Sequence, residues 1–167
     1  MFETLEIFLN AGQGFVLAFN AWCAKVKPAA LADHLCYKCG DAVKFETLRT
    51  LFESQSQFVY QSIISNRRIA IIKFLKPIPT DLGDIWFLEL SDQKPDNSQT
   101  SGFDHIEIYP IGGSLDMLAE SLAKAGTPFT KVERPHHTTF DVEINGPFKV
   151  RLEEEPLIEK IMREEMQ

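Results

Sequence analysis

Two histidines stand in matching sequence contexts, and their side chains are suited to binding a divalent metal ion. His34 follows Asp33 at the head of one strand-like run, and His105 follows Asp104 at the head of another. Imidazole is the commonest metal ligand among protein side chains. One histidine at a strand start is more often an ordinary polar residue, but two in the same context favour a shared role. We therefore predict that both histidines bind one metal ion.

Alternation along these two runs places the histidines on polar faces. Successive side chains of a strand point to opposite faces, so residues two apart share a face. His105 therefore lies beside Glu107, with two isoleucines on the other face, and His34 lies beside Cys36. The apolar faces can pack on helices, which leaves the polar faces available for binding.

Two carboxylates are candidates for the remaining ligands. Glu89 interrupts the apolar run Trp86 to Leu90, and a buried acid is costly unless it is paired or metal-bound. Glu153 ends the last strand-like run; alternation selects it, although a bulge would bring in Glu154 instead. The alternative is that Glu89 faces solvent and that the three consecutive glutamates are a solvated run. Mixed imidazole and carboxylate ligands suit Zn, Ni, Mn, Co or Fe, and the predicted ligands are His34, Glu89, His105 and Glu153.

Other polar residues have less specific interpretations. Glu107 and Arg151 share faces with the predicted ligands and would line the same site. His137 is either an acid, base or substrate contact, or a surface residue. Arg67 and Arg68 lie near a predicted turn and are either solvated or bind an anionic substrate.

One Cys-x-x-Cys pair is weak evidence for a metal. Cys36 and Cys39 fall in an extended run, where their sulfur atoms point to opposite faces. A zinc site usually needs a second pair of ligands.

The elements that must position these residues occur in a repeated order. Residues 1–32 are predicted to form a helical extension, with Gly12 and Gly14 dividing it into two helices and residues 29–32 as a connector. Residues 33–92 read as strand, helix and three strands, and residues 103–155 repeat that order after a polar surface connector. Residues 156–167 form a final charged helix. The fold class is therefore α+β, with two βαβββ modules forming a cupped mixed sheet.

The predicted boundaries follow from apolar periodicity and turn residues. Asn145-Gly146 is a strong hairpin signal between the last two strands. In the first module the strands are expected at residues 33–39, 58–64, 67–75 and 84–90, and the helix at 41–55. In the second they are expected at 103–109, 129–132, 138–144 and 148–153, and the helix at 114–125.

Composition narrows the kind of partner. The net charge of −7 opposes binding to nucleic acid or an anionic membrane, so a small molecule is the expected ligand. We expect no apolar stretch to approach the roughly 20 residues of a membrane helix. An acidic start and an odd number of cysteines favour a cytoplasmic, bacterial protein without disulfides. The oligomeric state is left open between monomer and homodimer.

The order of these motifs resembles the vicinal-oxygen-chelate superfamily, which includes glyoxalase I, fosfomycin-resistance proteins and extradiol dioxygenases. The strings Asp33-His34, Trp86-Phe87-Leu88-Glu89-Leu90 and Asp104-His105-Ile106-Glu107-Ile108, with the N-terminal helical extension, are similar to its YecM-like branch. The resemblance implies a cupped sheet around a divalent metal held by His34, Glu89, His105 and Glu153. YecM-like sequences are expected to have a histidine where this chain has Glu153, which bears on metal preference.

The resemblance leaves three functions open. One is a metal-dependent isomerase or lyase acting on a small oxygenated metabolite, with Glu89 or Glu153 as the base. Another is a non-haem iron dioxygenase that uses His34, His105 and Glu153, for which Glu89 would be the discriminating residue. The last is a protein that binds and sequesters a small molecule without turnover.

Overall fold

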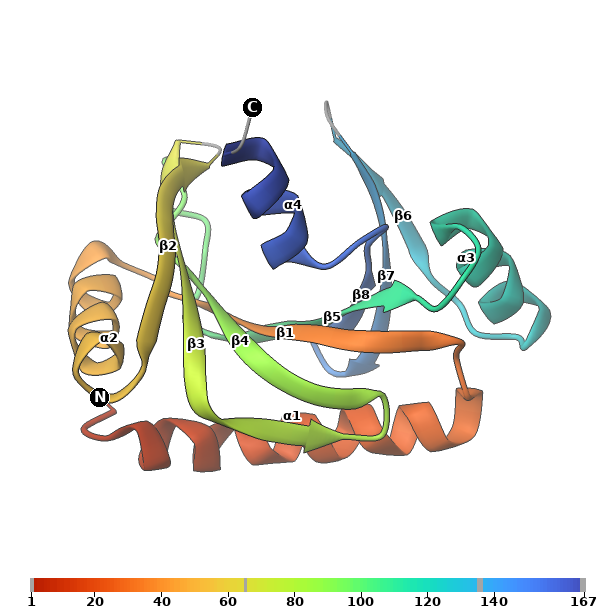
Figure 1. Cartoon of the computed structure of the whole chain (residues 1–167), viewed down its shortest axis with the longest axis horizontal. Coiled ribbons are helices and arrows are strands. Elements are labelled where there is room, and N and C mark those ends of the chain that lie inside the picture. Colours follow the sequence, from red (N-terminus) through yellow and green to blue (C-terminus); the bar gives the residue numbers. More distant parts are fainter. Residues whose placement is uncertain (1, 65, 135–136, 166–167) are drawn as a thin grey trace.

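The computed structural model describes residues 2–64, 66–134 and 137–165. Its elements follow the predicted order of an N-terminal helix, two successive modules and a C-terminal helix (Figure 1). They are α1 (Leu5–Val26), β1 (Ala30–Lys38), α2 (Ala42–Gln55), β2 (Gln57–Ile64), β3 (Arg67–Thr80), β4 (Gly83–Ser91), β5 (Gly102–Pro110), α3 (Leu115–Lys124), β6 (Thr130–Glu133), β7 (Thr138–Asn145), β8 (Phe148–Leu152) and α4 (Leu157–Glu165).

The eight strands form one mixed sheet in the order β2-β3-β4-β1-β5-β8-β7-β6. β1 and β5 run antiparallel at its centre, and each is parallel to the last strand of its own module, β4 or β8. The two ends of the sheet rise on the same side, so the sheet is curved like a cup (Figure 1). The predicted α+β class with two βαβββ modules in a cupped mixed sheet is confirmed.

The outer face of the sheet carries the main hydrophobic core. The helices α1, α2 and α3 start at side-chain caps from Thr4, Asp41 and Ser114, which accept hydrogen bonds from backbone N–H groups in the first turn. Their apolar stripes bury alternate residues of the strands. Completely or almost completely buried members of this core include Phe8, Phe19, Phe45, Phe52, Leu35, Ile106, Leu88 and Val150. This packing fixes the backbone of β1, β4, β5 and β8, whose other face carries the polar residues.

The N-terminal extension differs from its predicted form in two respects. α1 is one continuous helix, so the expected division at Gly12 and Gly14 was wrong. Gly12 instead permits close packing, because a Cβ atom there would lie 3.0 Å from the Cζ atom of Phe103. The expected connector at residues 29–32 is also wrong in part, since β1 begins at Ala30.

α1 also corrects the expectation about apolar stretches. It has 22 residues, and an 18-residue stretch within it has a mean hydropathy of 1.2, so it is long and apolar enough to cross a membrane by length and composition alone. Phe8 and Phe19 are fully buried beneath the sheet. Core helices and N-terminal signal sequences meet the same criterion, and 22% of this apolar stretch is buried.

The inner face of the cup holds α4, which lies between the raised ends of the sheet (Figure 1). Ile161 of α4 packs against Ile69 and Ile71 of β3 in a separate small apolar cluster. The backbone N–H of Leu157, at the start of α4, donates a hydrogen bond of 3.0 Å to Oδ2 of Asp33. The last helix thus contacts the residue that precedes His34.

Candidate metal centre

Strand pairing brings three of the four predicted metal ligands together on the inner face. Cys36 of β1 is paired with Glu89 of β4 on one side and with His105 of β5 on the other, and His34 lies two residues before it on the same face. One ligand atom from each of His34, Glu89 and His105 lies within 4.8 Å of the other two. These three side chains therefore form a group that could hold one ion.

Each histidine is oriented by the aspartate that precedes it. Nδ1 of His34 lies 2.8 Å from Oδ2 of Asp33, and Nδ1 of His105 lies 2.8 Å from Oδ2 of Asp104. An Nδ1–H that donates to a carboxylate leaves Nε2 with its lone pair. Such carboxylate–histidine pairs typically support metal-binding imidazoles.

Both Nε2 atoms are buried and, within the described residues, neither makes a hydrogen bond. Nε2 of His34 lies 3.5 Å from Oε2 of Glu89, without the geometry of a hydrogen bond. The centres of the two imidazole rings are 5.9 Å apart. A buried polar atom without a partner is costly, and a cation held by both nitrogens and by Glu89 would remove that cost. The residues present therefore fit a divalent metal.

The electrostatics favour the metal-binding forms of two ligands. Burial opposes ionisation of Glu89, but His34 and His105 outweigh it and lower its pKa to about 2. Burial and the positive charge of Arg151 lower the pKa of His105 to about 4. Both groups are therefore held in their unprotonated forms at neutral pH.

His34 behaves differently from His105. Burial opposes its protonation, but the carboxylates of Glu107, Asp33 and Glu89 outweigh burial and raise the pKa of His34 above its usual value. A metal bound at Nε2 would therefore have to displace a proton.

In the second module an arginine occupies the position that corresponds to Glu89 in the first module. Cys36 is paired with Glu89 across β1 and β4, and its counterpart Glu107 is paired with Arg151 across β5 and β8. Arg151, and not Glu153, is thus the equivalent of Glu89. The Nε and Nη2 atoms of Arg151 donate to the two carboxylate oxygens of Asp141, at 2.8 and 2.9 Å. This bidentate pair fixes the guanidinium next to His105.

Glu153 follows β8 and is not in the group of three. Its Oε1 atom lies 3.5 Å from Nε2 of His137, another predicted site residue. Burial raises the pKa of Glu153, although Lys160 and Arg151 oppose the shift. In the described part of the chain, no group of candidate ligands includes Glu153. Alternation selected Glu153, whereas the pairing of β8 with β5 puts Arg151 at the position equivalent to Glu89.

Glu107 lies next to the two imidazoles without belonging to the group of three. It is 6% exposed. Its Oε1 atom lies 3.7 Å from Nδ1 of His34, and its Oε2 atom lies 3.9 Å from Nε2 of His105. Burial and the charge of Glu153 raise the pKa of Glu107 to about 8, although His34 acts in the opposite direction. A buried carboxyl group of this kind can hold or release a proton beside a bound ligand.

Cys36 is the counterpart of Glu107 in the first module. Its Sγ atom lies 3.5 Å from Oε1 of Glu89, and burial raises the pKa of its thiol. Cys39 is fully buried in the core on the outer face. The two sulfur atoms therefore do not form one metal site, in agreement with the prediction from alternation.

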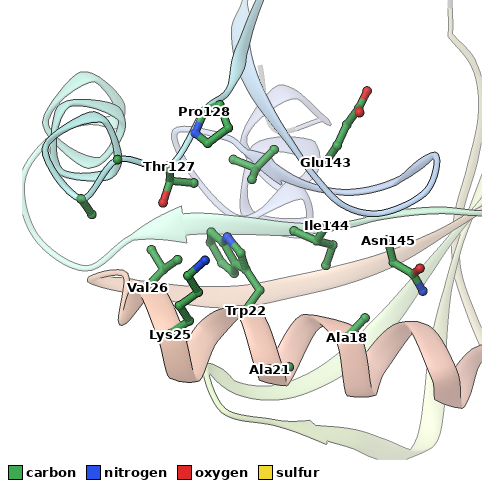
Figure 2. Close-up of a pocket in the computed structure, with 13 residues that line it drawn as sticks. Ala18, Ala21, Trp22, Lys25, Val26, Thr127, Pro128, Glu143, Ile144 and Asn145 are labelled. Atoms are coloured by element: carbon green, nitrogen blue, oxygen red, sulfur yellow. The ribbon is translucent and has the colours of Figure 1, made fainter.

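A cavity of about 590 Å³ opens onto this group. His105, Glu89 and Arg151 line it, together with residues of the connector and of the second module. A larger cavity of about 680 Å³ lies between α1, the end of α3 and β7, where Trp22 and Ile144 face it (Figure 2). None of the grouped ligands lines the larger cavity, so the smaller one is the candidate for ligand binding.

The arrangement of the strands defines the class of fold. Two βαβββ modules paired through β1 and β5 in one cupped mixed sheet are the glyoxalase-like fold. The chain belongs to the YecM protein family, whose model matches residues 4–157.

Solved structures support the same fold. A structural-genomics protein named EC4020 has 20% sequence identity and a TM-score of 0.74, over 97% of this chain and 93% of that one. Methylmalonyl-CoA epimerase, solved with methylmalonyl-CoA and NH4+, has 15% identity and a TM-score of 0.50, over 74% and 93%. No curated protein matches the chain.

Proposed function

We propose that this protein binds a divalent metal ion through His34, Glu89 and His105 and uses it in an isomerase or lyase reaction on a small oxygenated metabolite. The observation that carries the proposal is the pair of buried Nε2 atoms, each oriented by an aspartate and each without a hydrogen bond among the described residues. Zn, Ni, Mn, Co and Fe all accept this mixture of imidazole and carboxylate ligands.

A bound metal would act as a Lewis acid toward an oxygen atom of the metabolite. The residues of the chain supply the other requirements of a proton transfer. Asp33 and Asp104 orient the imidazoles. Glu107 lies within 4 Å of both rings and is shielded from water, which suits it to accept or return a proton on the bound molecule. Glu107 therefore replaces Glu89 and Glu153 as the preferred acid or base.

Non-haem iron oxygenation is the second candidate. Two histidines and one carboxylate are the ligand set of non-haem iron oxygenases. Glu153 lies outside the group, so the carboxylate of the set would be Glu89. Glu89 consequently no longer distinguishes this chemistry from isomerisation, and the reaction itself must be measured.

Proton exchange distinguishes the candidates. The metal-loaded protein would be incubated in D₂O with hydroxyketones and keto acids, and loss of the signal from hydrogens on carbon next to the carbonyl would be followed by proton NMR. We expect metal-dependent exchange that Glu107→Gln abolishes while the bound metal is retained. Oxygen consumption in the Fe(II)-loaded protein, without exchange, would favour the second candidate. Ligand binding without either reaction would indicate sequestration and contradict the proposed chemistry.

A further inference from the structure

The cavity beside the metal ligands is basic, although the chain as a whole is acidic. Its twelve lining residues include six lysines or arginines and three aspartates or glutamates. The whole chain carries a net charge of −7. The basic residues are Lys38, Arg67, Lys94, Arg134, Lys149 and Arg151. Positive charge is thus concentrated at a cavity through which a small molecule would approach Glu89 and His105.

Three of these cations are already paired with carboxylates of the chain. Nζ of Lys38 lies 2.7 Å from Asp104. Lys149 and Arg151 both contact Asp141. These pairs have a structural explanation, because they hold the side chains that surround the two imidazoles.

Neither Arg67 nor Arg134 makes a close ion pair with a carboxylate among the described residues, although Asp141 acts on the charge of Arg134 from a longer distance. Nη1 of Arg67 donates to the amide oxygen of Gln99 at 2.6 Å, and its Nε atom is buried without a hydrogen bond. Nη1 of Arg134 donates to the hydroxyl of Thr139 at 2.7 Å. Both side chains are half-buried, which makes an uncompensated charge expensive. These two guanidinium groups therefore have the capacity and the energetic reason to bind an anion.

The two arginines come from the two different modules of the fold. Arg67 is the first residue of β3, and Arg134 directly follows β6, so they reach the same cavity from opposite halves of the sheet. A small ligand between them would also meet Glu89 and His105. A volume of about 590 Å³ is within the range of small-molecule sites.

We propose that the ligand of this cavity is an anionic metabolite, whose phosphate or carboxylate group binds Arg67 and Arg134 while its other oxygens lie toward the metal ligands. Planar guanidinium groups match the geometry of both anions. The position of the metabolite's other oxygens rests on the proposed function. The basic lining of the cavity is observed independently of that function. The acidic chain as a whole disfavours a nucleic acid as the source of the phosphate.

Three probes with the same hydroxyketone group test the inference. Dihydroxyacetone is neutral, hydroxypyruvate carries a carboxylate, and dihydroxyacetone phosphate carries a phosphate. Their binding would be measured by isothermal titration calorimetry on the metal-loaded protein and on the metal-free protein. We expect at least one anionic probe to bind about tenfold or more tightly than dihydroxyacetone, as charge-assisted hydrogen bonds allow. The stronger of the two anionic probes identifies the anionic group.

Variants separate the basic lining from the metal ligands. Arg67→Gln and Arg134→Gln should each weaken the preferred anionic probe about tenfold and leave metal affinity and dihydroxyacetone binding unchanged. Arg49→Gln is the matched control, because Arg49 pairs with Glu46 and Glu53 on α2 and does not line the cavity. Equal binding of all three probes, or no effect of either arginine variant, would overturn the inference. Anion preference that persists in a protein unable to bind metal would support the inference and contradict the proposed function.

Discussion

Arg151 occupies in the second module the position that Glu89 occupies in the first. Glu89 is paired with Cys36 across parallel strands, and Arg151 is paired in the same way with Glu107. The repeat is therefore asymmetric at its centre, with two imidazoles, one carboxylate and one cation. That cation favours the neutral form of His105, and Asp141 holds it in place.

The Arg151–Asp141 pair should stabilise the fold mainly because each buried charge neutralises the other. Arg151→Met leaves the buried carboxylate of Asp141 without its main partner, so we expect the free energy of unfolding to fall by about 3 kcal/mol. The double variant with Asp141→Asn should recover much of that loss. Urea unfolding of the two single variants and the double variant gives the coupling energy. Additive effects of the two substitutions would show that the pair is not coupled.

The aspartates that orient the histidines should control metal affinity. Asp104→Asn removes the carboxylate that accepts from Nδ1 of His105, and we expect metal affinity to fall by 10- to 100-fold. Asp84→Asn, at an exposed position of β4, is the control and should have no effect. Competition titrations against a chelator dye measure both. An unchanged affinity in Asp104→Asn would mean that the aspartate does not support a ligand.

Metal binding should depend on pH through His34. Its pKa is raised in the metal-free protein, so the imidazole is protonated below that pKa and must lose the proton when a metal binds. Affinity should therefore fall as the pH is lowered, by up to about tenfold per unit for one displaced proton. Calorimetry in buffers of different ionisation enthalpy measures the protons released. Affinity that does not change between pH 6 and pH 8 would contradict this account.

The two glycines of α1 should respond in opposite ways to alanine. At Gly14 a Cβ atom meets nothing within 4 Å, so Gly14→Ala should raise the free energy of unfolding by up to about 1 kcal/mol through helix propensity. At Gly12 the new Cβ atom would lie 3.0 Å from the Phe103 ring, which must move. Gly12→Ala should therefore show no gain or a loss. Thermal unfolding of both variants makes the comparison, and equal gains would contradict the packing role of Gly12.

Much of the site could be predicted because it lies on strands with strict alternation. His34, Glu89 and His105 interrupt apolar runs, and the period of two places each on the inner face. The same rule could not choose between Arg151 and Glu153, because both share a face of the same run. Only the pairing of β8 with β5 distinguishes them, and that register depends on contacts between distant parts of the chain.

Other features depended on tertiary packing. Gly12 carries the sequence signal of a helix break, but its contact with Phe103 explains it instead. The Asp-His dipeptides are visible in the sequence, yet the role of each aspartate follows only from its contact with Nδ1 of the histidine. Arg134 lies outside the periodic runs, so no pattern associated it with the cavity that it lines.

The most direct test of the central claim is the metal content of the protein after equilibrium dialysis against Zn(II) or Mn(II), measured by elemental analysis. The account predicts one ion per chain, and a loss of tight binding in His34→Ala and in His105→Ala. The His137→Ala variant should retain the ion, because His137 lies with Glu153 outside the group of three. Failure of the unaltered chain to bind either ion, or retention of the ion by both His34→Ala and His105→Ala, would contradict the proposed metal centre.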